Sequence, residues 1–202
     1  MSLPRKCGVM LLPDCTLFPH GGLPLYVFEE RYRRMLEKAL EGECVFAIAR
    51  IKEHGNGGED EISHIGTAGL VRASRQRADG TSELLLHGVI RVKFLEWLDE
   101  EDYPCALIEP LPCEPLDEKQ GAAAMKTLRG AVEDGLANLP TDVQAGVLTL
   151  LDQADEPGLM SDLVAQQFVH DVDLRQKLLE TSSVGDRVAM LCGFFEKIRS
   201  SD

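Results

Sequence analysis

Hydrophobic residues in the first half of the chain fall in short runs that are rich in branched side chains and separated by Gly, Pro and charged residues. Runs of about four to eight such residues are typical of β-strands, because a strand needs few residues to cross a small sheet. We therefore predict strands at Gly8–Leu12, Leu23–Phe28, Cys44–Ile51, Ile65–Arg72, Ser82–His87, Val89–Trp97 and Ala106–Leu111.

One early segment has helical spacing. Apolar side chains recur every three or four residues from Tyr32 to Leu40, and Gly42 follows as a stop signal. The opposite face of this segment is charged, which predicts a surface helix covering the mouth of a barrel. The charged positions are Glu30, Arg33, Arg34, Glu37 and Glu41.

Glycines predict where the strands turn or bend. Asp79-Gly80 is a signal for a tight hairpin turn, because glycine readily adopts the positive φ that such turns require. Gly88 interrupts an apolar run, which predicts a bulge or sharp bend of the kind that closes a barrel. The Gly-rich segment His54–Asp60 is predicted to be a loop between strands.

The pattern becomes helical after the proline-rich segment Glu109–Leu116. We therefore predict two domains, residues 1–116 and 117–202, and an α+β fold in which a β-rich part with one early helix precedes a helical bundle. The bundle helices are predicted at about Glu118–Asn138, Asp142–Gln153, Gly158–Val169, Leu174–Glu180 and Val184–Arg199.

Composition narrows the class of protein. Hydrophobic residues make up 44% and charged residues 27% of the 202 residues, which is an ordinary globular balance. The formal charge of -13 disfavours nucleic acid as a partner, because phosphate binding relies on clustered Lys and Arg. No run approaches the roughly 20 apolar residues that span a bilayer, and no signal peptide is visible, so we expect a cytoplasmic protein that does not bind membranes.

The chain shows no motif of an enzyme. It lacks a phosphate-binding loop, a dinucleotide-binding glycine motif and a Gly-x-Ser-x-Gly nucleophile motif. The five histidines do not have zinc-ligand spacing, and the cysteine pairs Cys7/Cys15 and Cys105/Cys113 are too widely spaced for an ordinary structural zinc site. We predict no catalytic residue, metal, cofactor or disulfide.

Several short motifs occur in a characteristic order. In the first half they are Leu17-Phe18-Pro19, Leu23-Pro24-Leu25, Phe28-Glu29-Glu30-Arg31-Tyr32, Ile65-Gly66-Thr67-Ala68-Gly69 and His87-Gly88-Val89-Ile90-Arg91-Val92. In the second half they are Asp155-Glu156-Pro157, Asp162-Leu163-Val164-Ala165, Arg175-Gln176-Lys177-Leu178-Leu179-Glu180 and Val184-Gly185-Asp186-Arg187-Val188. Along nearly its whole length the chain thus resembles the amino-terminal substrate-binding domain of the Lon protease family, without the ATPase and the peptidase of that family.

The resemblance implies a PUA-like β-rich pseudo-barrel followed by a helical bundle. It also implies a non-catalytic module that binds exposed apolar segments of unfolded or damaged proteins, with an ATP-dependent protease as a candidate partner. The candidate substrate-binding residues are Phe18, Leu23, Glu30, Arg31 and Arg34. The neighbouring motif residues Leu25, Phe28 and Tyr32 are expected in the core.

Three alternatives remain open at this point. A PUA-like barrel could bind RNA, although the net charge argues against it. The chain could also be a regulatory protein-interaction module that does not bind unfolded protein, or an enzyme whose site no motif reveals. The oligomeric state is not indicated by the sequence.

Overall fold

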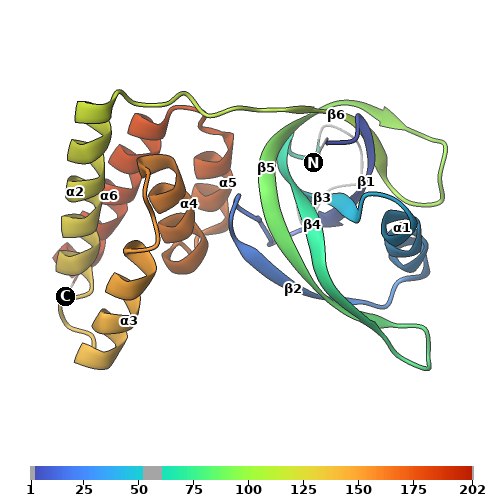
Figure 1. The fold of residues 1–202 in the computed structure, drawn as a ribbon, viewed down its shortest axis with the longest axis horizontal. Coiled ribbons are helices and arrows are strands. Elements are labelled where there is room, and N and C mark those ends of the chain that lie inside the picture. Colours follow the sequence, from blue (N-terminus) through green and yellow to red (C-terminus); the bar gives the residue numbers. More distant parts are fainter. Residues whose placement is uncertain (1–2, 52–60, 202) are drawn as a thin grey trace. The chain divides into compact units, whose positions relative to one another are not determined.

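The structure is a computed structural model, and it describes residues 3–51 and 61–201 (Figure 1). The chain separates into two compact units, residues 1–112 and 113–202, which are described one at a time. The first contains β1 (Lys6–Leu12), β2 (Gly22–Val27), α1 (Glu30–Glu41), β3 (Val45–Arg50), β4 (Ile65–Gln76), β5 (Ser82–Leu98) and β6 (Cys105–Pro110). The second contains α2 (Glu118–Gly135), α3 (Thr141–Leu151), α4 (Pro157–Phe168), α5 (Val172–Glu180) and α6 (Val184–Ser201). That residues 1–116 and 117–202 are separate domains that fold independently remains a prediction.

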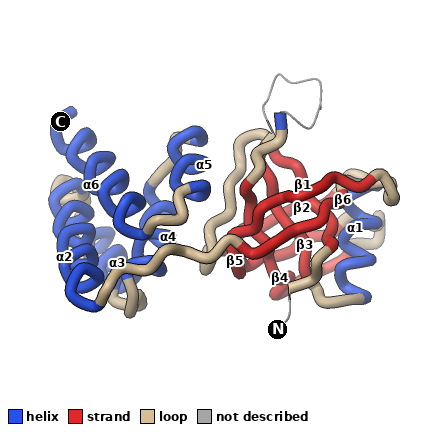
Figure 2. Tube along the Cα trace, turned by 90° about the horizontal axis from the view of Figure 1, so that it is seen from above, coloured by secondary structure: helices blue, strands red, loops and turns tan. Residues whose placement is uncertain are grey.

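The long strand β5 organises the first unit. The strand order is β2-β5-β4-β3-β1-β6, and β5 also pairs with β6. The strands β1, β3, β4, β5 and β6 therefore form a closed ring, in which β1 and β3 are parallel and the other neighbours antiparallel. Among the described residues, β2 pairs with the first half of β5 and lies at the edge of the sheet. Figure 2 shows the strands of this unit in red beside helix α1. The prediction of a β-rich barrel with one early helix and a helical bundle is confirmed.

Side chains along the strands alternate between two apolar clusters. On β3, Phe46 belongs to one cluster and Ala47 to the other, as expected when successive residues point to opposite faces. Helix α1 packs on the cluster of Phe46 with its buried side chains, which include Tyr32 and Met35. A Cβ atom on Gly8 of β1 would lie 2.5 Å from Cγ of Met35, so glycine permits the close approach of α1 to this strand.

The predicted turn and bulge are both present. Gly80 has a φ of 81°, and the carboxylate of Asp79 accepts a hydrogen bond of 3.0 Å from the backbone N–H of Thr81. The register of β4 against β5 shifts by one residue next to Gly88. A Cβ atom on Gly88 would overlap the carbonyl oxygen of Phe18, so the backbone there is in direct contact with the segment before β2.

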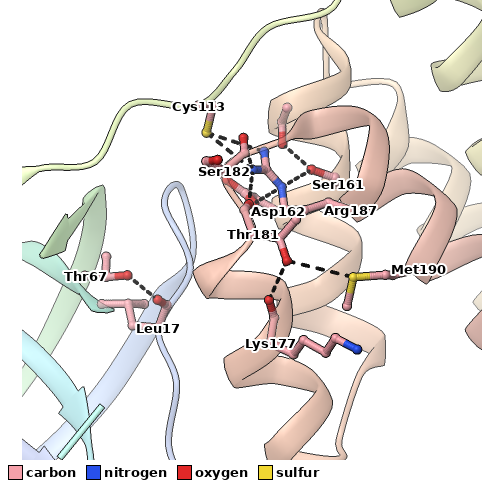
Figure 3. Close-up of polar contacts among 11 residues, drawn as sticks. Leu17, Thr67, Cys113, Ser161, Asp162, Lys177, Thr181, Ser182, Arg187 and Met190 are labelled. Carbon is pink, nitrogen blue, oxygen red and sulfur yellow. Dashed lines mark hydrogen bonds and ion pairs between the residues drawn. The ribbon is translucent and has the colours of Figure 1, made fainter. Parts of the chain in front are cut away.

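A buried arginine joins the helices of the second unit (Figure 3). Arg187 on α6 is 1% exposed, and its Nε lies 3.6 Å from Oδ1 of Asp162 on α4. Its guanidinium donates hydrogen bonds to the hydroxyl of Ser161 at 3.2 Å and to the carbonyl oxygens of Thr181 at 2.9 Å and Ser182 at 3.3 Å. These bonds tie α4, the connection after α5 and the start of α6 to one side chain.

Some predicted boundaries were wrong. The two strands predicted on either side of Gly88 form the single strand β5, because a bulge offsets the register without ending the ladder. Helix α5 begins at Val172, two residues before the predicted start, because the carboxylate of Asp171 accepts a hydrogen bond of 2.7 Å from the N–H of Leu174 and caps the helix. The predicted loop His54–Asp60 lies outside the described residues.

Within residues 3–51 and 61–201, no helix combines the length and the apolar sequence that are needed to cross a membrane.

The contact at Gly88 leads to a first prediction. Replacing Gly88 with Ala should lower the free energy of unfolding by about 2–3 kcal/mol, because the new methyl group has to displace the backbone of Phe18. Urea unfolding followed by circular dichroism measures this change. Gly22→Ala is the control, since a Cβ there lies 3.6 Å from the nearest side-chain carbon and meets no backbone. Equal effects of the two substitutions would contradict the account of this contact.

The buried ion pair leads to a second prediction. Arg187→Met should destabilise the second unit by about 3–5 kcal/mol. The substitution leaves the carboxylate of Asp162, whose side chain is only 4% exposed, without its cationic partner Arg187. The double variant Arg187→Met/Asp162→Leu should recover a large part of this loss. Arg199→Met is the control on the same helix, because Arg199 is 61% exposed at 3.7 Å from Asp134. If the control were as destabilising as Arg187→Met, burial of the pair would not be the cause.

Candidate functional site

The two apolar residues that the sequence suggested for binding are turned into the core. Phe18 is 0% exposed, so the expectation that it lies on an accessible surface is wrong. The segment is held in place because the buried hydroxyl of Thr67 donates a hydrogen bond to the carbonyl oxygen of Leu17 and because Gly88 packs on Phe18. Leu23 is half-buried and packs against the cluster beneath α1. A ligand on the surface would therefore not meet Phe18.

The charged candidates on α1 are exposed, but they are engaged in ion pairs. Arg34 pairs with Glu30 one turn earlier and with Asp102 in the connection between β5 and β6. Its hydrogen bond to Glu30, together with these charges, raises the pKa of Arg34. Arg31 pairs with Glu29, with Nε and Oε2 2.9 Å apart. Glu30, Arg31 and Arg34 thus lie on one helix, and each of them is paired with a residue of the first unit.

Two further pairs extend this ionic contact. Lys38 of α1 pairs with Glu101, and Lys6 of β1 pairs with Glu100. The bond to Glu101 raises the pKa of Lys38, and the bond from Lys6 lowers the pKa of Glu100. Exposed pairs of this kind add little to stability. They join the acidic connection to α1 and to β1. The polar face of α1 is best explained as a structural contact.

Exposed apolar side chains gather instead on the outer face of β2 and β5. Tyr26 is 51% exposed, Phe28 61% and Leu85 43%, and Pro24 is also exposed. Pro24 lies opposite Leu85, and Tyr26 lies opposite Glu83, so these side chains project from the same face of the sheet. We call Pro24, Tyr26, Phe28 and Leu85 the apolar strip.

Aromatic contacts give the apolar strip a defined form. The rings of Tyr26 and Phe28 are stacked with centroids 6.0 Å apart and planes 27° apart. The guanidinium of Arg77 lies 5.5 Å from the centre of the Tyr26 ring, and Arg77 also pairs with Glu83. A cluster of exposed aromatic and aliphatic groups beside charged residues is typical of a protein-binding surface.

The edge of β2 is poorly suited to accept an additional strand. In an antiparallel ladder, alternate residues direct their backbone groups to the same neighbour, and Pro24 has no N–H to donate. Because β2 pairs with β5 in register through Pro24, this residue is expected to face the free edge and to interrupt the row of donors there. A bound segment would therefore be held through its side chains on the apolar strip, and not by strand addition.

The apolar run Leu23–Phe28 could have indicated this surface, but its aromatic residue Phe28 was assigned to the core. Phe28 was expected in the core, and its exposure shows that this was wrong, whereas Tyr32 is 4% exposed and Leu25 packs against the cluster beneath α1. The run Leu23–Phe28 is apolar at every position. In a strand with one covered face, such a run places every second apolar side chain in solvent.

Within residues 3–51 and 61–201, no three or more His, Cys, Asp or Glu side chains are grouped so that they could hold a metal ion. Burial raises the pKa of Cys7 to about 12, so this thiol is protonated near neutral pH. Because the thiolate is the form that binds metals, Cys7 is a poor ligand.

The family model of the ATP-dependent protease La (LON) substrate-binding domain matches residues 6–197, which is most of the chain. The protein belongs to this family.

Curated relatives support the assignment. The chain is 26% identical over 190 residues to a Lon protease of Escherichia coli strain K12, with 93% of this chain and 24% of the relative covered. It is 27% identical over 191 residues to a Lon protease of Azorhizobium caulinodans, with 93% of this chain and 22% of the relative covered. The chain spans about a quarter of the length of these relatives or slightly less.

Solved structures show the same fold. The amino-terminal domain of a Mycobacterium avium complex Lon protease superposes with a TM-score of 0.76 at 15% identity, covering 95% of this chain and 98% of that domain. A Lon amino-terminal domain protein from Xanthomonas campestris superposes with a TM-score of 0.65 at 18% identity, covering 94% and 98%.

The exposure of the apolar strip leads to a third prediction. Tyr26→Ser and Phe28→Ser should each change the free energy of unfolding by no more than about 1 kcal/mol, because neither ring is in the core. Phe18→Ala should cost about 3–5 kcal/mol, because it leaves a cavity. Chemical denaturation of the three variants tests the contrast. A loss at Tyr26 or Phe28 as large as that at Phe18 would show that the strip serves stability.

Proposed function

We propose that this protein is a non-catalytic binding module for exposed apolar segments of unfolded or damaged proteins, and that it binds them on the apolar strip. Membership of the Lon substrate-binding family supports the class of ligand. The observation that carries the proposal is the set of exposed aromatic and aliphatic side chains along β2 and β5. Such side chains can bury the apolar groups that folded proteins hide and unfolded proteins expose.

The expected affinity is low for a single segment. Apolar burial contributes roughly 25 cal/mol per Å². Ordering a flexible ligand offsets much of this gain, so we expect micromolar or weaker binding for one short segment. Chains with several apolar segments rebind before they diffuse away, so their apparent affinity should be higher.

An ATP-dependent protease is the partner that this function suggests. The two curated relatives described above are Lon proteases, and the family is that of the Lon substrate-binding domain. We propose that a captured segment is passed to the ATPase and peptidase of such a protease, for which this module selects substrates.

The charge distribution favours this proposal over RNA binding. The formal charge is -13, and the basic side chains Lys6, Arg34 and Lys38 are paired with carboxylates. A phosphate backbone lying along α1 would have to displace these pairs, and it would also meet the overall negative charge. A regulatory module without affinity for unfolded protein is the remaining alternative, and the following experiment distinguishes it.

A fourth prediction tests the binding surface. Reduced, carbamidomethylated α-lactalbumin should bind the protein, and the variant Tyr26→Ser/Phe28→Ser/Leu85→Ser should bind at least about tenfold more weakly, because it lacks the apolar strip. Fluorescence anisotropy at low and high ionic strength provides the measurement. Most of the affinity should persist at high salt, since apolar burial is not screened.

The control removes exposed apolar groups elsewhere in the same unit. Leu95 on β5 is 50% exposed and Leu40 on α1 is 43% exposed, and Leu40→Ser/Leu95→Ser should leave binding unchanged. Absence of binding by the unmodified protein would favour the regulatory alternative. Equal losses in both variants would show that the apolar strip is not the binding surface.

A further inference from the structure

The apolar strip has a basic border, although the chain as a whole is acidic. Arg75 on β4 lies opposite Glu83 on β5, so its side chain projects from the same face as the strip. Glu83 pairs with Arg77. Arg75 is exposed and forms no ion pair with any residue of the described ranges, 3–51 and 61–201. Its charge is available to a ligand.

A second arginine lies on the same border. Arg72 is the additional residue of a bulge between Val71 and Ala73 of β4, and it is exposed. Val71 packs against the cluster beneath α1, so the next residue, Arg72, projects from the opposite face of the sheet. His87 also projects from that face, because it lies opposite Gly22 of β2. The charge of Arg72 contributes, after burial, to lowering the pKa of His87. Within the described part of the chain, Arg72 has no carboxylate as an ion-pair partner.

These two arginines differ from the basic residues of α1. Arg34 and Lys38 are held by carboxylates, so a ligand would have to compete with groups that are already in place. At Arg72 and Arg75 a ligand carboxylate meets no such competition. An acidic ligand would therefore gain an ion pair at each position without breaking one.

We propose that the apolar strip selects apolar segments that carry aspartate or glutamate nearby, with Arg72 and Arg75 binding the carboxylates. This inference rests on the proposed function and specifies its substrate. This preference for acidic segments is opposite to what the net charge of -13 would suggest. Charges next to the binding surface lie close to the ligand, whereas salt screens the more distant charges.

The sheet geometry sets the spacing of the preferred ligand. Tyr26, Glu83 and Arg75 form one row across β2, β5 and β4. Two strand separations place the backbone of Arg75 about 10 Å from that of Tyr26. An extended ligand covers this distance in about three residues, so the carboxylate should follow or precede an aromatic anchor at about that spacing.

Three synthetic peptides with the same Leu-Phe-Val-Leu-Phe centre test the inference. Their flanks on both sides consist of aspartate, serine or lysine. At low ionic strength the aspartate peptide should bind on the order of fivefold more tightly than the serine peptide, and the lysine peptide more weakly. At high ionic strength the three affinities should converge. Isothermal titration calorimetry with the full chain gives each dissociation constant.

Charge reversal identifies the residues responsible. The variant Arg72→Glu/Arg75→Glu should invert the order of the aspartate and lysine peptides and leave the serine peptide unchanged. The control Arg5→Glu/Lys93→Glu makes the same change in net charge at exposed positions directly before β1 and in the second half of β5, and it should keep the original order.

The outcomes separate the inference from the proposed function. Equal binding of all three peptides, or a preference that survives the reversal at Arg72 and Arg75, would overturn the selection of acidic segments and leave apolar binding intact. Failure of the serine peptide and of unfolded α-lactalbumin to bind would overturn the proposed function itself.

Discussion

The pairing of β5 with three other strands is the constraint on which the first unit depends. The second half of β5 pairs with β6 and closes the ring, whereas the first half pairs with β2 at the edge of the sheet. One face of β2 covers the core cluster beneath α1. The same pairing leaves the other face in solvent, where Tyr26 and Phe28 are exposed. Strand β2 thus covers the core with one face and, with the other, contributes to the surface that we propose binds substrates.

The charged residues divide into three groups with different roles. Arg187 is buried, and its hydrogen bonds make it part of the second unit's core. Arg34 is exposed but paired, so it holds the acidic connection after β5 against α1. Arg75 is exposed beside the apolar strip and has no carboxylate partner within the described residues. Residue type alone does not distinguish these roles, because each depends on which carboxylates the fold brings near.

Local sequence patterns were sufficient for much of the fold and insufficient for the site. The helical spacing from Tyr32 to Leu40 and the turn at Asp79-Gly80 depend on neighbouring residues, and both predictions are confirmed. The burial of Phe18 depends on Thr67 and Gly88, which are distant in sequence, so no local pattern revealed it. Phe28 was misassigned for another reason. It directly follows β2, which is apolar on both faces, and periodicity cannot show which face the rest of the chain covers.

The central claim is that unfolded segments bind on the outer face of β2 and β5. Its most direct test is a map of backbone amide chemical-shift changes, recorded while unfolded, carbamidomethylated α-lactalbumin is added to the isotope-labelled protein. The account predicts that the changes concentrate in β2, in residues 82–87 of β5 and in residues 72–76 of β4, which carry the strip and its basic border. Changes concentrated on the polar face of α1 or on the helices of the second unit would contradict it.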